Sequence, residues 1–169
     1  MTPFRIVHSF DTSPARYWKL FFHEPFNVAL YQRIKVKERK VLDWKETDGT
    51  IYRSIKIVPA RDLPGFIKKL VGGDLGYVES STFYKDKDSM DVTVEPTLFK
   101  DRTTMKARYW LEPVGEGKVT RIFEGSIKVE MPLVGKKVEQ FIIDDMNRGY
   151  QITTEMIHEW MKKPEFASV

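Results

Sequence analysis

Five ionisable residues occupy positions where the surrounding pattern predicts apolar side chains. His8, Arg53, Glu79 and Arg121 share strand parity with apolar neighbours, and Asp145 lies on the apolar face of a C-terminal helix. Burying an ion without a partner costs several kcal/mol, so each of these groups needs a partner if it faces the interior. Either they pair with one another, or they form a polar site inside an apolar cavity.

The first arrangement pairs Arg53 with Glu79 across adjacent strands. Arg121 then pairs with Asp145 or extends its charge to water. In the second arrangement these groups hold the carboxylate or phosphate of a ligand, because a planar guanidinium offers two parallel donors for that task. His8 alone is typical of a structural histidine with satisfied hydrogen bonds. The sequence leaves both arrangements open.

The sequence shows no motif for a metal site or for a catalytic nucleophile. The chain has no cysteine, and Gly125-Ser126 is not part of a Gly-x-Ser-x-Gly elbow. The three histidines lack metal-ligand spacing, and residues 86–91 lack the glycine that a calcium loop needs at its sixth position. No basic stripe with interleaved aromatic residues suggests a nucleic-acid surface. We therefore expect no catalytic residue, metal, cofactor or nucleic-acid partner.

The composition indicates one globular domain over residues 1–169, with 41% apolar and 31% charged residues. No apolar run reaches the 18 or so residues of a membrane span. The segment Met1–Asp11 does not have the pattern of a signal peptide, and the absence of cysteine fits a reducing compartment. We expect a cytoplasmic protein. Its formal charge of +4 is mild and distributed, and the oligomeric state is left open.

The segment from Met131 to Lys163 predicts one long amphipathic helix. Pro132 and Gly135 precede it and Pro164 ends it. About 26 helical residues would run roughly 39 Å, enough to lie across a whole sheet. Spacings of three and four place the following residues on one face: Val138, Phe141, Ile142, Asp145, Met146, Gly149, Ile152, Thr153, Met156 and Trp160.

Most of the preceding chain predicts strands. Two short helices interrupt them, one that begins at Ser13-Pro14 and one at Pro25. Lys35–Thr47 is so highly charged that we expect it at an edge of the sheet. The other alternating segments are Phe4–Phe10, Ile51–Val58, Tyr77–Tyr84, Met90–Val94, Thr103–Leu111 and Val119–Met131. Strands joined by hairpins favour an α+β layout with an antiparallel sheet covered on one face.

The segment Arg61–Gly73 is too apolar for a bare loop and predicts a short bridging helix. It could be a packed connector, a lid over a cavity, or a transient contact with an anionic membrane surface through Lys68 and Lys69. The residues that would form the lid are Leu63, Phe66, Ile67 and Leu70.

The order of elements resembles the helix-grip fold of the START-like (SRPBCC) superfamily, which includes the birch pollen allergen, polyketide cyclases and lipid-transfer domains. The resemblance rests on the strand Phe4–Phe10, the start at Ser13-Pro14, the strand Arg121-Ile122-Phe123-Glu124-Gly125 and the lead into the last helix at Pro132–Lys137. It is similar to uncharacterised bacterial members. The resemblance implies a curved antiparallel sheet of about seven strands around the C-terminal helix, with a cavity for an apolar ligand.

Strand parity and the helix face give a set of candidate cavity residues. They are His8, Arg53, Ile55, Tyr77, Glu79, Phe83, Met105, Tyr109, Arg121, Phe123, Phe141, Asp145, Met146 and Gly149. An ordinary core would show the same mostly apolar pattern, because ligand sites are themselves lined by apolar side chains.

Three functions follow from this set. The first is a carrier or sensor of a hydrophobic or amphiphilic, lipid-like small molecule. The second is a cyclase or dehydratase that uses His8, Glu79 or Tyr109 as an acid-base group. The third is a protein-interaction module whose interior is filled by its own side chains.

Overall fold

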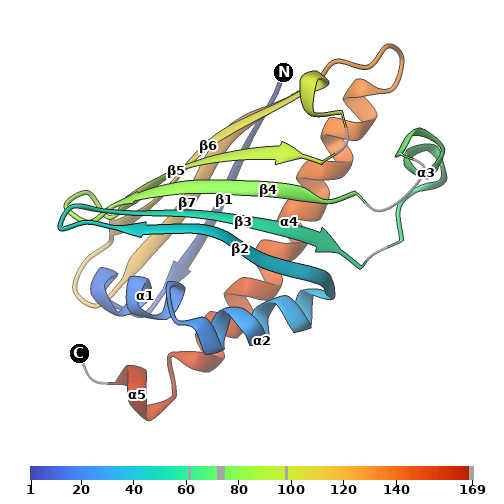
Figure 1. Cartoon of the computed structure of the whole chain (residues 1–169). Coiled ribbons are helices and arrows are strands. Elements are labelled where there is room, and N and C mark those ends of the chain that lie inside the picture. Colours follow the sequence, from blue (N-terminus) through green and yellow to red (C-terminus); the bar gives the residue numbers. More distant parts are fainter. Residues whose placement is uncertain (61, 72–74, 98, 168–169) are drawn as a thin grey trace.

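A curved antiparallel sheet and a long helix that lies across it form most of the structure (Figure 1). The computed structural model describes residues 1–60, 62–71, 75–97 and 99–167. Its elements are β1 (Thr2–Phe10), α1 (Pro14–Phe21), α2 (Glu24–Ile34), β2 (Val36–Glu46), β3 (Thr50–Pro59), α3 (Gly65–Val71), β4 (Tyr77–Tyr84), β5 (Ser89–Pro96), η1 (Lys100–Arg102), β6 (Thr103–Pro113), β7 (Val119–Val129), α4 (Gly135–Trp160) and α5 (Pro164–Ala167).

The seven strands lie in the order β1-β7-β6-β5-β4-β3-β2, and each pairs antiparallel with its neighbours. From β2 to β7 each strand pairs with its neighbour along the chain, whereas β1 pairs with β7 from Thr2↔Ile127 to Phe10↔Val119. This is the predicted helix-grip fold, with the expected number of strands. β2 is an edge strand, as its charges predicted.

The two short helices close one end of the sheet (Figure 1). Ser13 caps α1, because its Oγ accepts a hydrogen bond from the Arg16 N–H at 3.3 Å, and proline stands in the first turn of each helix. Tyr17, Trp18 and Leu20 of α1 are buried, and Trp18 packs on Phe83 of β4 with ring centroids 4.3 Å apart. The aromatic side chains of α1 therefore cover this end of the sheet.

The start of α4 is fixed to the sheet by a buried carboxylate. Glu139 is 2% exposed, and its Oε1 accepts a hydrogen bond from the Val129 N–H at 2.9 Å. Its Oε2 accepts hydrogen bonds from Thr2 Oγ1 and, at 3.0 Å, from Lys136 Nζ. Burial disfavours the charge, but these donors outweigh it and lower the pKa of Glu139 to about 2. Gly135 is required nearby, because a Cβ there would collide with the Val129 carbonyl.

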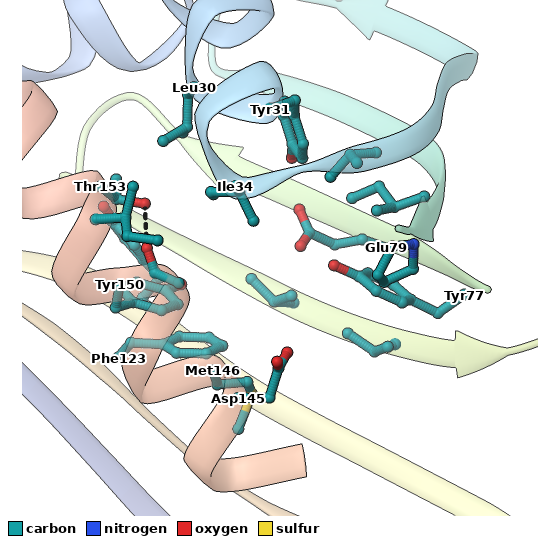
Figure 2. Close-up of a pocket in the computed structure, with 18 of the residues that line it drawn as sticks. Leu30, Tyr31, Ile34, Tyr77, Glu79, Phe123, Asp145, Met146, Tyr150 and Thr153 are labelled. Carbon is teal, nitrogen blue, oxygen red and sulfur yellow. Dashed lines mark hydrogen bonds between the residues drawn. The ribbon is translucent and has the colours of Figure 1, made fainter. Parts of the chain in front are cut away.

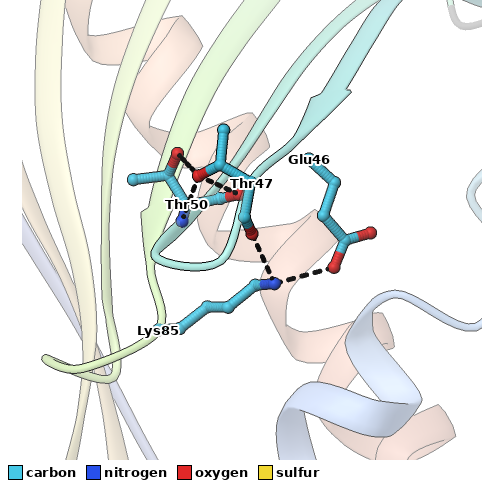
Figure 3. Close-up of polar contacts among 4 residues, drawn as sticks. All are labelled: Glu46, Thr47, Thr50 and Lys85. Carbon is cyan, nitrogen blue, oxygen red and sulfur yellow. Dashed lines mark hydrogen bonds and ion pairs between the residues drawn. The ribbon is translucent and has the colours of Figure 1, made fainter.

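Hydrogen bonds tie the β2–β3 turn to the next hairpin (Figure 3). Thr47 accepts a hydrogen bond from the Thr50 N–H at 3.0 Å, which closes the turn at Asp48-Gly49. Lys85, after β4, donates to the Thr47 carbonyl and to Glu46 Oε1, both at 2.8 Å. The exposed edge hairpin is thus held in register with its inner neighbour.

The predicted bridging helix is present as α3, at the end of the sheet opposite α1 (Figure 1). Ile67 is 1% exposed, whereas Phe66 is 37% exposed. Arg61, Gly72 and Gly73, which belonged to the same predicted segment, lie outside the described residues.

We expect Gly125→Ala to destabilise the fold by about 1–3 kcal/mol, as overpacking does in tight cores. A Cβ at this position of β7 would collide with the Lys106 carbonyl and lie 2.7 Å from the Ala107 Cβ. Gly149→Ala in α4 is the matched control. Its Cβ meets nothing within 4 Å, so the helix should gain about 0.5–1 kcal/mol. Urea denaturation measures both, and equal free energies of unfolding would contradict the packing argument.

Candidate functional site

A cavity of about 300 Å³ lies between the concave face of the sheet and the helices α1, α2 and α4 (Figure 2). Apolar and aromatic side chains form most of its wall. α4 contributes Ile142, Asp145, Met146, Arg148, Gly149, Tyr150, Ile152, Thr153 and Ile157. The face of α4 that borders the cavity therefore overlaps the predicted apolar face.

Most of the predicted candidates line this cavity. They are Arg53, Tyr77, Glu79, Met105, Tyr109, Phe123, Asp145, Met146 and Gly149. Ile55 and Phe83 are instead buried in the core, Phe141 is half-buried, and none of these three borders the cavity. His8 and Arg121 lie outside the wall as well.

None of the lid candidates Leu63, Phe66, Ile67 and Leu70 lines the main cavity. Ile67 and Leu70 line a separate pocket of about 40 Å³. That pocket shares Leu75, Pro96, Thr103 and Ile142 with the wall of the main cavity. α3 therefore covers a neighbouring gap at this end of the sheet, and the lid stays a prediction.

Arg53 and Glu79 form the predicted cross-strand pair. Arg53 Nη2 lies 3.5 Å from Glu79 Oε1, and the guanidinium also faces the rings of Phe21 and Phe22 at 5.1 and 5.8 Å. Figure 2 shows Glu79 on β4 and Asp145 on α4 directed into the space between α2 and α4. The charged part of this wall therefore contains two carboxylates and two arginines, because the exposed Arg148 of α4 also borders the cavity, and Glu79 compensates Arg53.

The prediction that Arg121 pairs with Asp145 or reaches water is wrong. Arg121 is 0% exposed, and its Nη2 donates hydrogen bonds to Thr154 Oγ1 at 2.9 Å and His8 Nδ1 at 2.7 Å. Asp145 precedes Thr154 by nine residues, about two and a half helical turns, so the two lie on opposite sides of α4. Asp145 lies 3.9 Å from Arg148 instead.

Three tyrosines surround the Arg121 guanidinium and also line the cavity. Arg121 stacks over the Tyr150 ring at 4.7 Å, and the Tyr17 and Tyr109 hydroxyls are hydrogen-bonded to each other. Burial opposes the charge on Arg121, but the oxygens of Tyr17, Tyr109 and Tyr150 outweigh it and the pKa of Arg121 is raised. Burial also raises the pKa of Tyr109 and of Tyr150 well above the ordinary value, so both hydroxyls keep their protons.

Tyr17 and Tyr150 were missed as cavity residues. A signal for Tyr150 was present, because Met146, Tyr150, Thr153 and Ile157 follow one another at spacings of four, three and four. Tyr17 was hidden among neighbouring aromatic residues. A buried tyrosine hydroxyl needs a partner, but sequence alone does not show that this partner is Tyr109.

His8 must be neutral to accept the hydrogen bond from Arg121. Its pKa is lowered, first by burial and then by the charge of Arg121. Stability is then complete above the unfolded-state pKa of about 6.5, and is lost as pH falls from there toward the lower folded-state pKa.

We therefore expect the free energy of unfolding to fall when the protein is acidified from about pH 7 to about pH 5. His8→Gln keeps an oxygen that can accept from Arg121 but has no titrating ring, so it should lose less over the same interval. Urea denaturation at both pH values gives the comparison, and the values at neutral pH separate any packing change. An identical loss in the wild type and the variant would contradict this assignment.

No helix in the described part of the chain is long and apolar enough to cross a membrane. Among those same residues, no group of three or more histidines or acidic residues is placed to hold a metal ion.

Several solved structures share this architecture. The protein TTHA0849 from Thermus thermophilus superposes with a TM-score of 0.63 at 12% identity, covering 94% of this chain and 95% of its own. The Zhui aromatase/cyclase from Streptomyces sp. R1128 gives 0.61 at 8% identity, with 97% and 98% covered. A START superfamily protein from Mycobacterium smegmatis gives 0.53 at 11% identity, with 92% and 98% covered. The fold is therefore the START-like helix-grip fold.

Sequence comparison gives one further finding. A family model described as "Protein of unknown function (DUF2505)" matches residues 5–161. No curated protein sequence matches the chain.

Proposed function

The chain belongs to the DUF2505 family and has the START-like fold, and from this premise we propose that it binds a hydrophobic small molecule between the sheet and α4. The single observation that carries the proposal is the cavity of about 300 Å³ with its mostly apolar wall. Ligand sites have volumes of roughly 300–1,000 Å³ and walls of this kind.

Space of this size is unusual for a plain core. Protein interiors are close-packed, and an unfilled apolar cavity costs about 24 cal/mol per Å³. A fold that keeps about 300 Å³ open gives up stability that filled packing would provide. This argues against the third predicted function, a module whose interior is filled by its own side chains.

The wall supports binding more directly than catalysis. Of the three predicted acid-base residues, His8 lies outside the cavity, where its ring accepts from Arg121. Glu79 lines the cavity and is paired with Arg53, and Tyr109 is hydrogen-bonded to Tyr17. A carrier or sensor therefore remains our first proposal, and a cyclase-type enzyme would have to use Glu79 and Tyr109.

Filling the cavity should weaken the binding of a hydrophobic ligand. Gly149 lines the cavity and has open space beside it, so Gly149→Phe would place a ring inside. The neutral fluorescent probe N-phenylnaphthylamine should bind the wild type and bind this variant at least about tenfold more weakly, a change of about 1.4 kcal/mol. Glu155→Phe, on an exposed position of the same helix, is the control and should bind as the wild type does. Failure of the wild type to bind any such probe, or undiminished binding by Gly149→Phe, would remove the proposal.

We also propose that α3 makes transient contact with an anionic membrane surface. Phe66 is 37% exposed and is followed by the exposed Lys68 and Lys69, of which Lys68 lies 3.1 Å from Asp62. Cosedimentation with phosphatidylglycerol vesicles should decrease for Phe66→Glu and for Lys69→Glu, because one removes apolar insertion and the other reverses a charge. Neutral phosphatidylcholine vesicles are the control. Equal recovery on both kinds of vesicle would contradict an electrostatic contact.

A further inference from the structure

The charge of Arg121 is not compensated by any carboxylate that the structure describes. None of the ion pairs among the described residues includes Arg121, and its Nε and Nη1 have no hydrogen-bond partner. Its Nη2 contacts only neutral acceptors, namely His8, Thr154 and the Tyr150 carbonyl. Arg121 is therefore a buried cation beside which none of the described residues supplies an anion, and a counter-charge brought by a ligand would be favourable there.

Aromatic side chains separate this charge from the cavity. The guanidinium lies against the rings of Phe10 and Tyr150, at 5.1 and 4.7 Å. Tyr17, Tyr109 and Tyr150 belong to the cavity wall, whereas Arg121 does not. A ligand in the cavity would therefore contact the tyrosines directly. The charge of Arg121 would act on it through them, without direct contact.

The paired hydroxyls of Tyr17 and Tyr109 have one proton to spare. Only one of their two protons is used in the hydrogen bond between them. A nearby positive charge attracts the phenol oxygen and repels its proton. Arg121 therefore favours the arrangement in which Tyr17 turns its oxygen to the guanidinium and donates to Tyr109. The proton of Tyr109 is then free to donate to a ligand that reaches this part of the wall.

The other charged groups of the wall give an anion no such position. Glu79 already compensates Arg53, and on the facing helix Asp145 lies 3.9 Å from the exposed Arg148, so these charges of the wall pair with each other. An anionic head group would find both of these arginines already paired and would be attracted instead toward the end of the cavity near Arg121. An ammonium head group would be repelled from the end near Arg121 and would find the carboxylates of the wall already paired.

We propose that the Tyr17–Tyr109 hydroxyl pair, backed by Arg121, is the head-group site for a hydrophobic carboxylic acid. The carboxylate accepts the Tyr109 proton and supplies the charge that Arg121 lacks, while the aliphatic chain fills the apolar remainder of the cavity. This rests on the proposed function, because it requires that the cavity be occupied by a ligand.

Isothermal titration calorimetry near neutral pH with decanoate, decanol and decylamine tests this site. The three probes share one alkyl chain and differ only in the head group. The wild type should bind decanoate about tenfold more tightly than decanol, and decylamine most weakly. Tyr109→Phe keeps the ring and removes the hydroxyl, so decanoate should lose about tenfold while decanol loses clearly less.

A second test variant and a control variant complete the experiment. Tyr17→Phe breaks the same hydroxyl pair from α1 and should also weaken decanoate selectively. Tyr84→Phe removes a hydroxyl that contacts Asp91 at 3.2 Å in another part of the sheet, and should bind all three probes as the wild type does.

The outcomes separate this site from the proposed function. If decanoate binds no better than decanol, or if Tyr109→Phe weakens all three probes equally, the head-group site is wrong while hydrophobic binding stands. If neither these probes nor N-phenylnaphthylamine binds the wild type, both proposals fall.

Discussion

Two buried ionic side chains fix the rotation of α4 on the sheet, and the shape of the interior depends on them. Glu139 joins the first turns of α4 to the Val129 N–H and to Thr2, and Arg121 joins the later turns through Thr154. Glu139 and Thr154 lie fifteen residues apart, on nearly the same side of the helix. With that side held against β1 and β7, the adjacent side faces β3–β6 and α2. The cavity is what remains between them.

The charges of Glu139 and Arg121 are accommodated in different ways. Glu139 is a carboxylate surrounded by donors, so its charge is satisfied locally and its pKa falls. Arg121 is surrounded by neutral oxygens and aromatic faces, so its charge is tolerated but not cancelled. The Arg53–Glu79 pair provides a third case, in which both charges are supplied by the protein. Of the three, only the environment of Arg121 would gain from an anion brought from outside.

The fold could be predicted from the sequence because its signals are local. Alternation along Tyr77–Tyr84 and the proline at the start of α1 each act over a few residues, and both elements form as expected. The partner of Arg121 could not be predicted, because strand parity says which face a side chain is on but not which helical face lies opposite. The error over Asp145 came from treating the apolar face of α4 as one surface, when the side with Thr154 meets Arg121 of β7 and the opposite side, with Asp145, meets the cavity.

The cavity itself was expected only by analogy with the fold. Its volume depends on the curvature of the sheet and on the distance between α4 and the sheet. A pattern of residue types predicts neither quantity. Glu139 was missed for a related reason. One of its partners is the backbone N–H of Val129, the last residue of β7. A residue pattern does not show which backbone N–H groups are available as donors.

The pairing of the first strand with the last has a consequence for how the chain folds. Phe10 pairs with Val119, and Thr2 with Ile127, so this contact closes a loop of more than a hundred residues, whereas every other strand pairs with its neighbour along the chain. Loop-closure entropy makes such non-local contacts slow to form. During synthesis the strands β2–β5 can assemble early, but their apolar concave face stays uncovered until α4, which follows all seven strands, has emerged. Until then this surface is exposed to other nascent chains and to chaperones.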